Sequence, residues 1–431
     1  MLKIGVVCLA RKTFDYNAAA EIYKEKIEEL KSIKYVEFIF DENLVIEVEE
    51  AQNSVKKFVD VDGIVIISGT FHLGHLALIY ASLKKPMLLW AFNELPYNGG
   101  KIRLNSVCGL NLNASNLYKA GYDNFHYTVG DKIDMDWINA LKMKKVLENT
   151  RLGVVGSRAH GFFNLGIDEL NLNGKAGTLI DYLQLDELFD YANNSESQYE
   201  EKLKEIYDVS GINNTQLSKV SKLIRGLELF FKEKNINAMA IRCWPEFASK
   251  YGISPCAAMS YLQANDYIIG CEGDVEGTLS MIATKAASNS TPFLADLSQV
   301  NLEENYALLW HCGVAAYNLW DKKSNRSLDT YFAGGKGVTA DFVLKPGVIS
   351  LLRIDSARGK TRLFIAKGEA VEMKKELKGT YAKVIFENHI NSLLDTLVKN
   401  GVAHHAAMVY GDYMRTFEIF GQLMGWEIIR G

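Results

Sequence analysis

The chain has 431 residues, of which 48% are apolar, and its 48 Lys and Arg residues against 52 Asp and Glu residues give a formal net charge of −4. This length predicts about three domains with ordinary globular cores, and a charge without any basic block argues against nucleic acid or a membrane surface as a partner. Six scattered cysteines, none in a CxxC pair, and the lack of any run near the roughly 20 apolar residues that span a bilayer predict a soluble, cytoplasmic protein with reduced thiols.

The first 150 residues alternate between strand and helix patterns. Residues 3–10 (KIGVVCLA) are typical of a buried strand, and residues 17–30 have helical periodicity with charges on one face. Strand patterns return at 35–40, 62–68 and 87–91, with helical patterns between them. This alternation predicts a Rossmann-like α/β domain with a parallel sheet over residues 1–150.

A second α/β series begins at residue 151. Residues 151–158 (RLGVVGSR) predict a strand that enters a turn, residues 198–233 predict long charged helices, and residues 237–241 (NAMAI) predict another strand. We therefore expect a second Rossmann-like domain over residues 151–287. Its loop at 154–161 follows a strand, so this loop is a candidate for lining a ligand cleft.

The pattern changes after about residue 288. Short apolar runs between Gly-containing turns are typical of the antiparallel strands of a small barrel or a sandwich, and we expect a β-barrel-like domain over residues 288–431. Gly359, Lys360 and Thr361 resemble the end of a phosphate-binding loop, but Ile354 occupies the position where that loop requires glycine. These residues therefore predict a hairpin turn.

Three carboxylates alternate in the segment CEGDVEGTLSM, residues 271–281. If the segment is extended, Glu272, Asp274 and Glu276 face the same side, and a buried cluster of like charges needs a cation or a shared proton. Alternatively, the acids lie in a solvent-facing loop or cap the helix that follows, where the helix dipole favours them. The spacing leaves both interpretations open.

Four further residues could contribute to a site. Glu246, in RCWPEF, follows an apolar strand and a proline. His404 and His405 precede the apolar run AAMVY, so at least one ring is expected to point inward, as a metal ligand or as a buried core histidine. His311, in LLWHCG, has the same two interpretations.

The motifs RCWPEF, CEGDVEGTLSM, WHCG and GVAHHAAMVYGD occur in the same order as in the L-fucose isomerase family. The chain resembles the shorter members of that family, related to both L-fucose and L-arabinose isomerases, over nearly all of its length. Sulfoquinovose isomerases belong to this broad group, so a 6-sulfonated sugar is a candidate substrate. The resemblance implies a metal-dependent aldose–ketose isomerase that works by enediol proton transfer.

The resemblance also implies the site residues. A divalent cation, usually Mn²⁺, would be held by Glu246, Asp274 and His405, with Glu246 and Asp274 also acting as general base and acid. Arg11, in CLARKTFD, matches a turn that approaches the active site of a neighbouring subunit in the family, which implies a homo-oligomer with sites near its interfaces. The residues implied for substrate contact are Arg11, Trp244, His311 and His404.

Two other functional classes fit the same sequence. Two α/β domains that flank a cleft are also the plan of a non-catalytic intracellular sugar-binding protein. A metal-dependent epimerase or aldolase would use the same enediolate chemistry. The basic residues Lys101, Arg103 and Arg158 could meet an anionic substituent of a sugar, or could equally be solvated surface.

Overall fold

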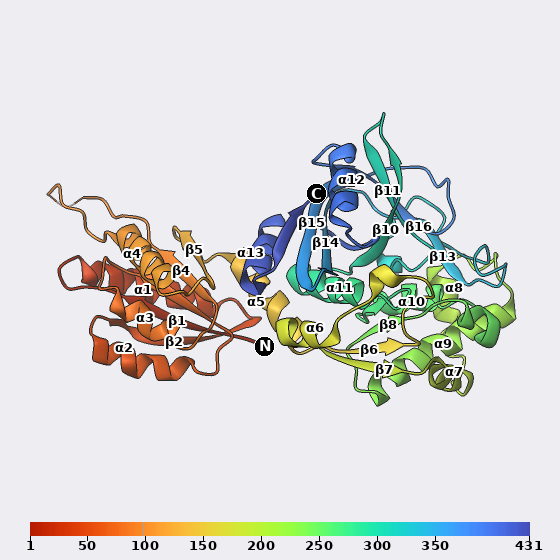
Figure 1. The fold of residues 1–431 in the computed structure, drawn as a ribbon, viewed down its shortest axis with the longest axis horizontal. Coiled ribbons are helices and arrows are strands. Elements are labelled where there is room, and N and C mark those ends of the chain that lie inside the picture. The colour runs from red at the N-terminus through yellow and green to blue at the C-terminus, as the bar shows by residue number, and fades with distance from the viewer. Residues whose placement is uncertain (98) are drawn as a thin grey trace. The chain divides into compact units, whose positions relative to one another are not determined.

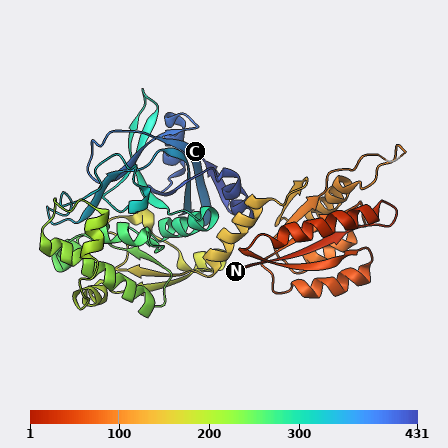
Figure 2. The same ribbon diagram turned by 180° about the vertical axis from the view of Figure 1, so that it is seen from behind.

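The computed structural model describes residues 1–97 and 99–431 of the chain. These residues form two compact units, Met1–Lys145 and Val146–Gly431; Figures 1 and 2 show the first in red to orange and the second in yellow to blue. Within the described residues, every helix is too short or too polar to pass through a bilayer.

The first unit contains a five-stranded parallel sheet in the order β2-β1-β3-β4-β5. Its central strand β3 (GIVIIS) is buried along its whole length, as expected for a β-branched strand covered on both faces. The predicted parallel α/β fold is confirmed here. The strands are β1 Leu2–Leu9, β2 Val36–Val45, β3 Gly63–Ser68, β4 Met87–Ala91 and β5 Phe125–Val129, and the helices are α1 Tyr16–Lys31, α2 Val48–Ser54, α3 His75–Ala81, α4 Ser106–Lys119 and α5 Met135–Glu148.

The second unit begins with a four-stranded parallel sheet in the order β7-β6-β8-β9. The loops after β6, β8 and β9 leave the carboxyl edge of this sheet, the edge at which open α/β sheets bind ligands. The strands are β6 Arg151–Val155, β7 Leu179–Leu183, β8 Ala238–Ile241 and β9 Ile269–Gly270, and the helices are α6 Glu169–Ala176, α7 Leu185–Asn193, α8 Glu200–Ile206, α9 Asn214–Glu233, α10 Cys256–Gln263 and α11 Val275–Ser288.

Six antiparallel strands form a closed barrel in the rest of the second unit. They pair in the order β16-β11-β10-β17-β14-β15, and β15 pairs back with β16. The β14–β15 hairpin turns at Arg358 and Gly359, which confirms the predicted turn. The strands of this region are β10 Phe293–Asn301, β11 Tyr306–His311, β12 Ser327–Asp329, β13 Thr339–Val343, β14 Gly347–Ala357, β15 Lys360–Val371, β16 Thr380–Phe386, β17 His405–Tyr410 and β18 Glu427–Arg430, and the helices are α12 Ile390–Asn400 and α13 Met414–Met424.

Helix α11 joins the parallel sheet to the barrel. It contacts β8 and β9 on one side and β10, β14 and β17 on the other (Figure 1), and it is buried from Val275 through Thr284. The close approach of α11 to β14 requires glycine at position 277, because a side chain there would collide with Asp274 and Arg353. The N-terminus of α11 therefore lies where the carboxyl edge of the sheet meets the barrel.

Candidate active site

Polar residues from four segments converge beside the N-terminus of α11. The loop after β9 supplies Glu272 and Asp274, and β17 begins with His405. The adjacent barrel strands β10 and β11 supply Asp296 and His311. We call this group the histidine–carboxylate cluster, and its members are Glu272, Asp274, Asp296, His311, His404 and His405.

His405 is at the centre of the cluster, and its side chain is fully buried. Its Nδ1 lies 2.9 Å from Asp274 Oδ2; because an ionised carboxylate can only accept, Nδ1 carries the proton. Its Nε2 has no hydrogen-bond partner among the described residues, although it lies 3.5 Å from Glu272 Oε2 and 3.4 Å from Asp296 Oδ1. A buried nitrogen that faces two carboxylates needs a proton or a metal ion between them.

Asp274 is engaged through both carboxylate oxygens. Oδ1 accepts from the N–H of Gly277 at 2.9 Å and caps α11, whereas Oδ2 accepts from His405 and from Arg353 Nη1. Burial alone would raise the pKa of Asp274, but the Arg353 charge and the His405 hydrogen bond hold it well below its usual value. The helix-cap interpretation is thus confirmed for Asp274. The alternative of an extended segment with three acids on one side is wrong, because the chain turns into α11 at this point.

Glu272 has a strained backbone and an ionised side chain. Its φ of 61° lies in the left-handed region, which costs a non-glycine residue about 1–3 kcal/mol and is most often retained at functional sites. The N–H of Ala159 donates to its carbonyl at 2.8 Å and helps to fix this conformation. Burial opposes ionisation, but the contact with His404 Nε2, 3.4 Å away, and the neighbouring His405 lower the pKa of Glu272.

The cluster contains two overlapping sets of metal-binding groups. One set is Glu272, His311 and His405, and the other is Asp296, His404 and His405; in each, one ligand atom per residue lies within 4.8 Å of the others. The His311 ring lies almost parallel to that of His405, with centroids 5.4 Å apart, and its buried Nε2 has no hydrogen-bond partner among the described residues. Carboxylate and imidazole groups together suit Mn²⁺ and other divalent ions. The residues therefore fit a bound divalent metal.

Glu246 lies in the loop after β8, in a separate set of contacts. Its Oε1 is 2.7 Å from Arg242 Nη2, and its Oε2 is buried without a hydrogen-bond partner in the described part of the chain. Together with Ser157, these side chains line a cavity of about 410 Å³. The interactions seen among the described residues bring Asp274 and His405 together but do not link either directly to Glu246.

Aromatic packing joins the predicted substrate-contact residues in the second unit. Trp244 packs edge-on against Phe162 with centroids 5.9 Å apart, and Phe162 packs edge-on against His404 at 5.4 Å. The loop that carries Glu246 is therefore next to the cluster. Arg11 belongs to the first unit, where its backbone N–H donates to Thr70 Oγ1 at 2.9 Å.

Two residues that the sequence motifs did not single out contact Asp274 or His405. Arg353 is fully buried on β14 and pairs with Asp274, and Asp296 faces His405 across the β10–β17 pair. The run LLRID did contain a signal, since a cation inside an apolar strand requires a buried partner. Asp296 lies in the segment ADLSQV, and nothing in that segment predicts that this residue belongs to a site.

Glu276, in the first turn of α11, should make stability depend on pH. Burial raises its pKa from 4.5 to about 7 although Arg353 opposes the shift, so its contribution to stability is complete below pH 4.5 and is lost as the pH rises through 7. Between pH 5 and 8, the free energy of unfolding of the chelator-treated protein should fall by about 2–3 kcal/mol more than that of Glu276→Gln. Urea titrations followed by tryptophan fluorescence measure this difference, and the exposed Glu303→Gln is the control. An equal pH dependence in Glu276→Gln would contradict the expectation.

Two family models match the chain. Residues 5–142 match the fucose/sulfoquinovose isomerase N-terminal domain, and residues 309–430 match the L-fucose isomerase C-terminal domain. Together the two matches cover more than half of the chain and include His311, His404 and His405. The chain belongs to the fucose isomerase-related family. It is accordingly an aldose–ketose isomerase that acts on a sugar, as the sequence motifs predict.

Curated relatives extend over nearly the whole chain. The sulfoquinovose isomerase of Priestia aryabhattai is 28% identical over 437 residues, which cover 98% of this chain and 97% of the relative. That of Alkalicoccus urumqiensis is 26% identical and covers 100% and 99%. A solved solute-binding protein from Actinobacillus succinogenes with bound D-allose aligns with 67% of this chain and 93% of its own at 12% identity, but its TM-score of 0.18 supports no argument.

Proposed function

We propose that the protein interconverts sulfoquinovose, a 6-sulfonated aldose, and the corresponding 2-ketose by proton transfer between C1 and C2, with Mn²⁺ as the preferred metal. The names of the full-length relatives support the substrate. The donor groups of the histidine–carboxylate cluster support the metal. The observation that carries the proposal is the Nε2 of His405, which lies between two carboxylates and has no hydrogen-bond partner within residues 1–97 and 99–431.

We propose that His405 Nε2 and Glu272 hold the metal, and that His311, His404 and Asp296 supply the remaining donors in the cluster. A bound cation would polarise the C1 and C2 oxygens of the open-chain sugar. Asp274 then acts through His405, because both of its oxygens are already engaged and its hydrogen bond fixes which nitrogen of the ring is free. The role of Asp274 as a direct ligand, which the family resemblance implies, remains a prediction.

The side chains on the carboxyl edge of the parallel sheet would move the protons. Glu272 follows β9 and Glu246 follows the adjacent β8, so the two carboxylates leave the same edge of the sheet. The ionised Glu272 can accept the C2 proton and return it at C1. Glu246 has one carboxylate oxygen without a hydrogen-bond partner in the part of the chain that the structure describes, so it can carry the proton between the two sugar oxygens.

The proposal is tested by following sulfoquinovose in D₂O by NMR. We expect conversion to the 2-ketose with deuterium at C1, exchange of the C2 proton in the remaining aldose, a loss of activity of at least about 100-fold after EDTA treatment, and recovery with Mn²⁺. EDTA saturated with Mn²⁺ is the control for chelator effects unrelated to metal removal. L-Fucose, L-arabinose and unsulfonated glucose should react more slowly.

Other outcomes point to other functions. Full activity after chelation would overturn the metal role, and conversion without deuterium would indicate a hydride shift. An epimer or a cleavage product would indicate an epimerase or an aldolase. Sugar binding without turnover, unaffected by chelator, would indicate a sugar-binding protein.

Replacing Glu246 by glutamine should lower kcat by about 10²–10⁴-fold with little change in KM, because the variant keeps the shape of the side chain but cannot carry a proton. Steady-state assays with sulfoquinovose measure both constants. Glu303→Gln, an exposed glutamate between β10 and β11, should retain wild-type activity. A kcat of Glu246→Gln within threefold of wild type would exclude Glu246 from proton transfer.

A further inference from the structure

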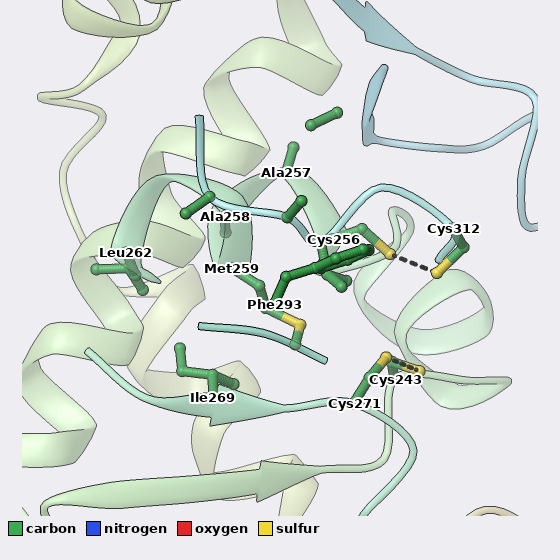
Figure 3. Packing of buried hydrophobic residues seen from close by; sticks show 14 of the residues in the cluster. Cys243, Cys256, Ala257, Ala258, Met259, Leu262, Ile269, Cys271, Phe293 and Cys312 are labelled. Carbon is green, nitrogen blue, oxygen red and sulfur yellow. Dashed lines mark hydrogen bonds between the residues drawn. The ribbon is translucent and has the colours of Figure 1, made fainter. Parts of the chain in front are cut away.

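Four of the six cysteines meet at one place in the second unit. They come from separate segments: the end of β8, the first residue of α10, the end of β9 and the end of β11. All four are buried, and Figure 3 shows two pairs of side chains that face each other, Cys256 with Cys312 and Cys243 with Cys271, near Phe293 and Met259. We call this group the thiol cluster, and its members are Cys243, Cys256, Cys271 and Cys312.

The sulfur atoms form two close pairs that are linked to each other. Cys243 and Cys271 have their Sγ atoms 3.1 Å apart, and Cys256 and Cys312 have theirs 3.6 Å apart (Figure 3). Cys271 and Cys312 connect the pairs, because their Sγ atoms and a ring nitrogen of His311 all lie within 4.8 Å of one another. For comparison, two thiolates on one tetrahedral Zn²⁺, each at 2.3 Å, are roughly 3.8 Å apart.

Hydrophobic packing alone does not account for this arrangement. A buried cysteine can serve as a small apolar side chain, but the core requires apolar volume and does not require sulfur at four positions. Both pairs of sulfur atoms are in direct contact, at 3.1 and 3.6 Å. His311 Nδ1 lies 3.2 Å from Cys312 Sγ, but it accepts a hydrogen bond from the Cys312 N–H at 2.9 Å. The soft metal-binding groups at this place are therefore the four thiols.

The thiol cluster lies beside the active site, and the two groups of side chains suit different metal ions. Cys271 directly precedes Glu272, and Cys312 directly follows His311. The His311 ring lies between the two groups, because its nitrogen atoms are within 4.8 Å of the Cys271 and Cys312 sulfur atoms and within the same distance of ligand atoms of Glu272 and His405. Thiolate groups select soft ions such as Zn²⁺, whereas carboxylate and imidazole groups suit Mn²⁺.

Cys271, Cys312 and His311 are the group whose ligand atoms all lie within 4.8 Å of one another, and Cys243 and Cys256 each contact one of the two cysteines in it. We propose that the thiol cluster is a second, structural metal site that binds Zn²⁺, with Cys271 and Cys312 as ligands and with Cys243 and Cys256 moving in to complete the coordination when the ion binds. The ion would cross-link β8, β9, α10 and β11, and so would tie the parallel sheet to the barrel directly behind Glu272. Complete burial fits a closed structural site that takes up its metal as the chain folds. The proposal does not depend on which sugar the enzyme uses.

The test uses the full-length protein, purified under reducing conditions and freed of loosely bound ions. Elemental analysis should find about one Zn²⁺ per chain. X-ray absorption at the zinc edge should find sulfur neighbours at about 2.3 Å. Co²⁺ incorporated in place of Zn²⁺ should give sulfur-to-cobalt charge-transfer absorption, which a site built only from oxygen and nitrogen cannot produce.

Matched variants test whether the bound zinc and the charge-transfer absorption come from the thiol cluster. Cys271→Ala and Cys312→Ala should lose the bound zinc and the charge-transfer absorption, and Cys8→Ala, an equally buried cysteine in the first unit, should keep both. If the two variants do not fold, the X-ray absorption of the wild-type protein still decides the question. Zinc with only oxygen and nitrogen neighbours, a protein without zinc, or mass spectra that show a disulfide within the cluster would each overturn the proposal.

Discussion

Exchanging His405 for glutamine is expected to lower kcat/KM for sulfoquinovose by at least about 10³-fold, with weaker Mn²⁺ binding. The exchange keeps a polar group near Asp274 but removes the ring nitrogen that faces Glu272 and Asp296. Because that nitrogen has no other partner among the described residues, its loss should affect the metal more than the fold. Isomerisation assays and calorimetric titration with Mn²⁺ measure the two effects.

The matched control is His389→Asn at the N-terminus of α12. The His389 side chain accepts from the N–H of Asn391, and asparagine is a preferred residue at that position. This variant should retain wild-type activity. If His405→Gln keeps kcat/KM within about tenfold of wild type, His405 does not hold a catalytic ion.

The Asp274→Asn variant should lose both activity and stability. The fully buried Arg353 would lose the carboxylate that its Nη1 contacts and keep only Glu276 and Asp355, at 3.8 and 4.0 Å. Breaking a buried pair on one side costs about 3–5 kcal/mol, and these two carboxylates should place the loss at the lower end of that range. An amide N–H directed at His405 would also favour the other ring tautomer, which places the proton on the nitrogen that faces the carboxylates. We therefore expect a fall in kcat of about 10³–10⁴-fold, by analogy with tautomer loss in other catalytic histidines.

A double variant separates these two effects. Asp274→Asn combined with Arg353→Met removes the cation that has lost its nearest partner, so part of the lost free energy of unfolding should return while the activity stays low. The return should be incomplete because Glu276 and Asp355 also lose a cation in the double variant. Urea unfolding and the isomerisation assay, run on both single variants and the double variant, complete the cycle. Stability of Asp274→Asn equal to wild type would show that the Asp274–Arg353 pair contributes little, and activity in the double variant would show that Asp274 is not needed to orient His405.

The layers of the fold could be predicted because their signals are local. The apolar run GIVIIS and the alternation of strand and helix patterns indicate a parallel sheet without knowledge of any partner strand. The closure of the barrel is different, since it depends on β15 pairing with β16 as well as β14. Such a pairing joins strands through contacts that no local sequence pattern reports. The sequence therefore predicted only that this region is a barrel or a sandwich.

The candidate site was predictable where a residue's surroundings are set by its sequence neighbours. The apolar run after His405 indicated an inward ring, and the helix predicted after Asp274 allowed a helix cap. The position of Glu272 in the cluster could not be predicted, because its direction depends on a left-handed backbone that contact with Ala159 helps to fix. No periodic pattern reports such a contact, and the pairing of Asp296 with His405 depends on strand register in the same way.

Closure of the barrel limits which changes of sequence this enzyme can tolerate. Asp296 and His405 stand opposite each other on β10 and β17, and a slip of one residue would turn either side chain to the other face. In a ring of strands, one strand cannot slide without disturbing every neighbour in turn. An insertion or deletion within these strands should therefore be tolerated far less well than one in the loops, and evolution or engineering toward a new sugar is expected to proceed through loop exchange on an unaltered ring.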